Sequence, residues 1–151
     1  MTRGTVTKRR RREQEADLEY RTGALADAAL IASALGDDTE PFVRQLAALG
    51  GGRTPLVVAI ATWATALSTF LSERASPVGA VAHIQGSSFP ENEGDAQSVA
   101  DVVGAAIDGD VVRACRLCVA MGQRQFGVVV RSVLRLVGDE FAIAIDRQEQ
   151  S

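Results

Sequence analysis

Residues 54–72 read TPLVVAIATWATALSTFLS, a run of nineteen side chains without a charge. The run opens with Thr54 and Pro55, a typical helix start, and its apolar residues then repeat at helical spacing: Leu56, Ile60, Trp63 and Leu67. A run of this length can cross a bilayer, so a buried central helix and a membrane span both fit. Two features favour the central helix: no second segment is this apolar, and hydroxyl side chains recur along it, at Thr62, Thr65, Thr69 and Ser72.

Helical spacing of apolar residues continues on both sides of this segment. Glycines close several of the patterns, notably Gly36 after the first and Gly138 after the last. The three glycines 50–52, followed by Arg53, could cradle an anion at a helix start, but a hinge between helices is the better interpretation because no Lys follows. The predicted helices cover residues 13–35, 39–49, 54–72, 95–108, 111–122 and 123–137.

These patterns predict an all-α fold of about six helices in two packed triplets, residues 13–75 and 95–138, joined by a loop at 76–94. A length of 151 residues suits one domain, which we expect to span residues 13–151. Residues 1–12 are expected to form a disordered basic arm. Short strands near 78–84 and 141–145 are the alternatives to loop and helix there.

Side chains that carry most catalytic and metal chemistry are scarce, with one His, two Cys and one Tyr in the chain. His83 has no recognisable nucleophile motif around it, and Cys115 and Cys118 lie within a predicted helix, where buried, inert thiols are expected. Zinc sites need about four ligands. We therefore expect a protein that is not an enzyme and holds no metal or other cofactor.

Two further features bear on location and origin. The basic N-terminus is not followed by an apolar segment, and two cysteines form no disulfide framework, so a cytoplasmic protein is expected. The fifteen arginines against one lysine are the composition expected of a GC-rich genome, such as an actinobacterial or phage genome.

Charge is segregated along the chain, although the formal net charge is only −3. Residues 1–12 carry six basic side chains and no acidic one, whereas residues 13–110 carry fifteen acidic and four basic side chains. Residues 111–138 carry five arginines and no acid, and residues 139–151 carry four acids and one arginine. Such asymmetry is a clue to partners rather than to fold.

The arginines of the last two predicted helices are the strongest functional signal. Arg113 and Arg116 are expected to lie away from a buried stripe of Val111, Cys115 and Val119. In the next helix, three arginines share the face opposite its apolar stripe: Arg124, Arg131 and Arg135. With no acid on either face, they need an anion elsewhere: nucleic-acid phosphates, a partner's carboxylates or the acidic first half of this chain.

The first interpretation is a non-enzymatic helical binding or assembly module that engages an acidic protein partner, or another copy of itself, through these arginines. The alternative is a small nucleic-acid-binding protein that tolerates many sequences. A third is a single-span membrane-associated protein through residues 54–72, although a membrane partner is disfavoured. The candidate binding residues are Lys8, Arg9, Arg10, Arg11, Arg12, Arg113, Arg116, Arg124, Arg131 and Arg135.

Overall fold

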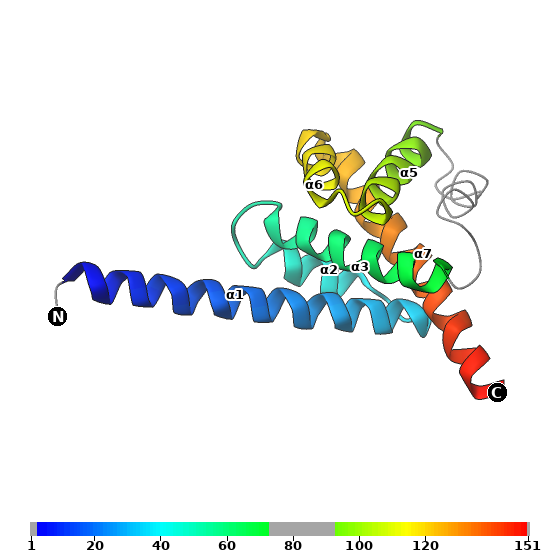
Figure 1. Ribbon diagram of the computed structural model, residues 1–151, viewed down its shortest axis with the longest axis horizontal. Coiled ribbons are helices and arrows are strands. Elements are labelled where there is room, and N and C mark those ends of the chain that lie inside the picture. Colours follow the sequence, from blue (N-terminus) through cyan, green and yellow to red (C-terminus); the bar gives the residue numbers. More distant parts are fainter. Residues whose placement is uncertain (1–2, 73–92, 151) are drawn as a thin grey trace.

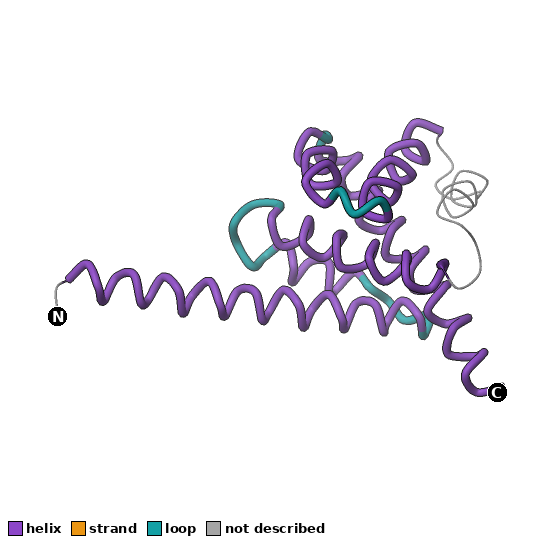
Figure 2. The backbone as a smooth tube through the Cα atoms, viewed as in Figure 1, coloured by secondary structure: helices purple, strands orange, loops and turns teal. Residues whose placement is uncertain are grey.

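The computed structural model describes residues 3–72 and 93–150. Six helices account for nearly all of them (Figure 1): α1 (Arg3–Ala34), α2 (Glu40–Ala47), α3 (Thr54–Ser72), α5 (Glu93–Ile107), α6 (Val111–Ala120) and α7 (Gln123–Gln150). Figure 2 shows only helices and short connections in these ranges, which confirms the all-α prediction. Residues 73–92 lie outside the described residues. They include His83, the strand considered at 78–84 and all but the last two residues of the predicted loop at 76–94.

The uncharged helix α3 lies at the centre of the fold and packs against each of the other five described helices. Its Ala59, Ile60, Trp63 and Leu67 side chains are buried, and the Trp63 Nε1–H donates a hydrogen bond of 3.0 Å to the carbonyl oxygen of Ala26 in α1. The exposed hydroxyls of α3 donate to carbonyls one turn earlier. No helix in residues 3–72 or 93–150 is long and apolar enough to cross a membrane.

Helix α1 begins at Arg3, ten residues earlier than the expected start at Glu13, and it includes the basic run that the sequence predicted as a disordered arm. Arginine and lysine are good helix formers, so this run can extend a helix that is already nucleated downstream. Arg9 Nε also lies 3.7 Å from Glu13 Oε1, one turn ahead. The N-terminal half of α1 projects beyond the other helices (Figure 1).

Helix α7 continues through Gly138, where the sequence predicted a helix end, and it reaches Gln150. The strand considered as the alternative to helix at 141–145 does not form, because these residues belong to the helix. Gly138 lies where α7 crosses α1 closely: a Cβ atom added to it would lie 2.6 Å from the Cβ atom of Ser33. The glycine permits close approach of two helices and does not end one.

Side chains from all six helices form one hydrophobic core. Helix α7 connects the two predicted triplets, because it packs against α1 and α3 as well as against α5. Helices α5 and α6 form a hairpin over one side of α3. This arrangement leaves outward-facing surfaces on α6, on the tip of α1 and on the C-terminal end of α7, which are the candidates for function.

Candidate binding surfaces

Two of the three predicted α7 arginines are paired with acids of the chain itself. Arg124 donates from both terminal nitrogens to the two carboxylate oxygens of Asp95, at 3.2 Å each. Asp95 lies in the first turn of α5, and its side chain is only 9% exposed whereas that of Arg124 is 73% exposed. The predicted helix over 95–108 starts at Asp95, but α5 begins two residues earlier, and the Asp95 carboxylate serves this ion pair.

The second pair joins α7 to α2. Arg131 donates from Nε and one terminal nitrogen to the two carboxylate oxygens of Glu40, at 2.5 and 3.1 Å. These hydrogen bonds lower the pKa of Glu40 and raise the pKa of Arg131, and the ionic attraction acts in the same direction. The third of the predicted α7 arginines, Arg135, is exposed. Arg124 and Arg131 therefore pair within the chain, with acids of its own acidic segment, residues 13–110.

Helix α6 is rotated relative to the sequence prediction. Ala114 and Cys118 face the core, whereas the predicted buried stripe faces outward: Val111 and Val119 are exposed and Cys115 is half-buried. The helix has apolar residues on two faces, so local spacing alone does not choose between them. Leu117 and Met121 pack against the core together with Cys118, which gives the buried face more apolar contact.

This rotation creates an exposed apolar stripe beside two arginines, which we call the α6 face: Val112, Arg113, Cys115, Arg116 and Val119. Val112 is 61% exposed and Val119 is 67% exposed. Cys115 and Val119 also line a shallow groove with Val58 of α3, which is itself exposed. Both arginines are exposed, and within residues 3–72 and 93–150 no acidic side chain pairs with either guanidinium.

Arg53, which the sequence placed in a hinge, is a structural residue. One terminal nitrogen of Arg53 donates to the carbonyl oxygens of Cys118 and Met121, at 3.1 and 2.6 Å, and its guanidinium lies 4.8 Å above the ring of Phe126. The preceding residues Gly50, Gly51 and Gly52 have φ values of 94°, 78° and 65°, a conformation that favours glycine. Together they turn Arg53 inward, where it caps the end of α6 rather than facing an external anion.

The basic tip of α1 is the most isolated charged surface. Every side chain from residue 7 to residue 17 is exposed, and Leu18 is the first that is partly buried. Arg9 lies near Glu13. Within residues 3–72 and 93–150, no acidic side chain pairs with its four basic neighbours, Lys8, Arg10, Arg11 and Arg12. Five of the ten predicted binding residues thus lie on one projecting helix segment.

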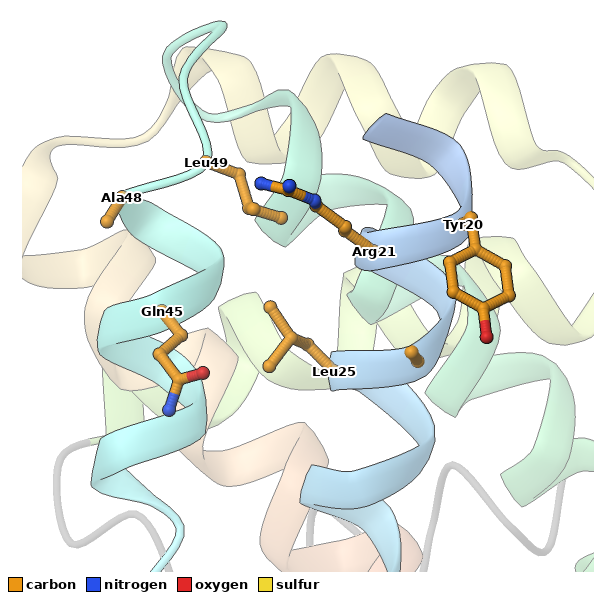
Figure 3. A pocket seen from close by; sticks show the side chains of 7 residues that line it. Tyr20, Arg21, Leu25, Gln45, Ala48 and Leu49 are labelled. Carbon is orange, nitrogen blue, oxygen red and sulfur yellow. The ribbon is translucent and has the colours of Figure 1, made fainter. Parts of the chain in front are cut away.

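An apolar groove lies between α1 and α2 (Figure 3). Leu25 and Leu49 point toward one another across it, and Arg21 extends from α1 toward Leu49. Tyr20, on the outer side of the groove, is 77% exposed. The groove combines large apolar side chains with a single charged one, and no feature beside it indicates what occupies it.

The two thiols differ in environment. Cys118 is buried, and burial, followed by the nearby Cys115 thiol, raises its pKa to about 11. Cys115 is half-buried at the edge of the α6 face. Among the described residues, no three His, Cys, Asp or Glu side chains gather in a way that could hold a metal ion.

Comparison with protein-family models, curated proteins and solved structures finds no match to this chain. Sequence patterns missed three residues that shape these surfaces, Glu40, Arg53 and Asp95, because each acts on a helix distant in the sequence.

Proposed function

We propose that this protein is a non-enzymatic binding and assembly module whose α6 face takes up an acidic, partly apolar helix. The observation that carries the proposal is the combination of an exposed apolar stripe with two arginines that have no acidic partner among the described residues. Apolar burial would supply the binding free energy, and the guanidinium groups would select an acidic partner.

The chain itself offers a helix of this chemistry at the C-terminal end of α7. Asp139, Ile143 and Asp146 are all exposed, and their spacing places them along one stripe of the helix. Ile143 is 37% exposed, so it can bury further surface when covered. The two carboxylates are separated by about 10 Å along the helix axis, which suits a contact with the short α6. We therefore assign a second copy of the chain as the partner.

The two surfaces lie far apart on one molecule, with α6 and the C-terminus at opposite sides (Figure 1). Such a head-to-tail contact uses a different patch on each copy and joins successive copies into rings or chains. The expected product is a series of oligomers whose average mass rises with protein concentration. The ionic part of the contact weakens as salt rises, because surface charges are screened.

Sedimentation velocity on the full chain tests this proposal. Wild-type protein should associate, while Arg113→Glu/Arg116→Glu and Asp139→Lys/Asp146→Lys should each be monomeric, because like charges then oppose one another. An equimolar mixture of the two variants should associate again, since each supplies the surface that the other lacks. A control, Arg10→Glu/Arg11→Glu, makes the same charge change on the tip of α1 and should associate like the wild type.

A wild-type protein that stays monomeric at its highest soluble concentration would overturn the assignment of a second copy. Association that persists in both reversed variants would also overturn it, because the contact would then lie elsewhere.

A further inference from the structure

The tip of α1 has a geometry and charge that the α6 proposal does not use. We propose that residues 8–12 of α1 form a docking element for double-helical DNA, which enters the major groove and contacts phosphates without reading the sequence. This inference stands on different residues from the proposed function and does not depend on it.

Basic side chains surround this segment of the helix on every side. Lys8, Arg9, Arg10, Arg11 and Arg12 are consecutive, and successive residues of an α-helix are about 100° apart, so five of them surround the axis. The structure shows these side chains exposed and the helix continuous through them. A segment that is positive on every side suits a site with negative charge on two sides, which is what the two phosphate backbones flanking a groove provide.

The composition of this segment does not suit a membrane surface or a groove in another protein. Between residues 8 and 17 the only apolar side chain is Ala16. An amphipathic helix that lies on a membrane needs an apolar face, and a helix that binds a protein groove needs apolar anchors at spacings of three and four residues. Neither is present, so electrostatic contact with phosphates is the interaction that this segment can make.

Among nucleic acids, duplex DNA has the groove that fits this helix. An α-helix with its side chains is about 10–12 Å wide and fits the major groove of B-form DNA, which is about 12 Å wide. The major groove of RNA duplexes is too narrow for this, and single strands are held largely by stacking on aromatic rings. The first aromatic residue of the chain is Tyr20, twelve residues after Lys8.

The acidic residues that follow the basic run limit the contact. Glu13, Glu15, Asp17 and Glu19 come directly after it and are exposed, so they repel phosphates and keep the body of the protein away from the DNA. Only the tip enters the groove, and residues 8–12 neutralise at most five phosphates. Each neutralised phosphate contributes about −0.9 to the slope of log K against log salt, so residues 8–12 should contribute no more than about 4.5 to the magnitude of the slope.

The experiment is a gel-shift or anisotropy titration of the full chain with a random-sequence 20-base-pair DNA duplex at several salt concentrations. Arg10→Gln/Arg11→Gln keeps helix propensity and removes two charges, so the magnitude of the salt slope should fall by about 1.8. The matched control, Arg44→Gln/Arg147→Gln, makes the same change in net charge at two exposed arginines that belong to neither proposed surface, and it should leave the slope unchanged. Glu15→Gln/Glu19→Gln should tighten binding, because it removes repulsion.

Circular dichroism of each variant verifies that the helices remain. An absence of binding to the duplex at low salt would overturn the proposal, and so would an equal loss in the Arg44→Gln/Arg147→Gln control, which would indicate a nonspecific effect of net charge. Equal affinity for single-stranded DNA or duplex RNA would overturn the groove mode. None of these outcomes bears on the self-association of the α6 face, which sedimentation measures separately.

Discussion

Ser33 of α1 occupies the space above Gly138 of α7, where these two helices approach closely. A Cβ atom on residue 138 would lie 2.6 Å from Ser33 Cβ and 2.9 Å from the Ser33 carbonyl carbon, both too close for atoms that are not bonded. The Ser33 hydroxyl donates a hydrogen bond of 2.9 Å to the carbonyl oxygen of Leu134, which lies one turn before Gly138 in α7. The crossing therefore combines a missing side chain with a polar contact between the helices.

Gly138→Ala should destabilise the protein even though alanine is the better helix former. Alanine gains up to about 1 kcal/mol of helix propensity, but forcing α1 and α7 apart should cost more, with overpacking typically in the range of about 1–3 kcal/mol. Because the clash includes the backbone of Ser33, a rotamer change cannot relieve it. Thermal and urea unfolding would measure the difference.

Gly23→Ala is the matched control for this substitution. Gly23 also lies inside a helix, α1, and a Cβ atom there would meet nothing within 4 Å. This variant should be as stable as the wild type or more stable. If both variants are stabilised, the close crossing is not a feature of the protein in solution.

The ion pair between Arg131 and Glu40 predicts a pH dependence of stability. The folded-state pKa of Glu40 is lowered, chiefly by its hydrogen bonds with Arg131. The pair therefore stabilises the fold fully at a pH above the unfolded-state pKa of Glu40. This stabilisation is lost as the pH falls through the lower, folded-state pKa. Both side chains are partly exposed, at 50% for Arg131 and 35% for Glu40, so its contribution should be below about 1 kcal/mol.

Arg131→Gln should therefore be less stable than the wild type at pH 7, and the difference should shrink as the pH falls below the ordinary glutamate range. Urea unfolding at pH 7 and at a pH near 3 provides the measurement. Glu40→Gln should show the same loss at pH 7, because it breaks the same pair. A difference that is equal at both pH values would show that Arg131 acts through packing instead.

Local periodicity was sufficient to predict the helices, but it could not predict what lies opposite them. Apolar spacing placed a helix at 54–72 and three further helices, α2, α5 and α6, close to their observed bounds, because each helix buries one stripe. The face of α6 was wrong because this helix has two apolar stripes, and only packing against α3 and α5 selects one.

The ion-pair partners of the α7 arginines could not be predicted from local sequence, because they lie in distant parts of the chain. Asp95 is 29 positions from Arg124, and Glu40 is 91 positions from Arg131. The lack of an acid on the same helix face therefore does not imply an external partner, because an acid from another helix can pair with the arginine. The same long-range packing explains Gly138, whose role depends on Ser33 in the first helix.

The two cysteines should differ in reactivity. The Cys118 thiol is buried with a pKa of about 11, so it has little thiolate at neutral pH, whereas Cys115 reaches the surface at the α6 face. A thiol reagent should modify one group per chain in the folded protein and two in denaturant. Cys115→Ala should abolish the reaction of the folded protein, and Cys118→Ala should leave it. Rapid modification of both thiols in the native state would contradict the buried position of Cys118.

Arg53 should control the order of the helix that carries the binding face. Its guanidinium satisfies the carbonyl oxygens of Cys118 and Met121, which the end of α6 leaves without intrahelical donors. Arg53→Met keeps much of the apolar stem over Phe126 but removes both hydrogen bonds, which should cost about 1.5–3 kcal/mol since the donor is charged.

The effect should also be local, because α6 has only ten residues and is held at its C-terminal end by this side chain. Hydrogen exchange in Arg53→Met should therefore speed up in α6 more than in the central α3, and self-association should weaken, since the α6 face is less ordered before binding. Arg10→Met, which removes an exposed arginine from the tip of α1, should leave exchange in α6 unchanged. Uniformly faster exchange in every helix would instead indicate that Arg53 supports the whole core, and equal exchange in variant and wild type would show that the cap does not form.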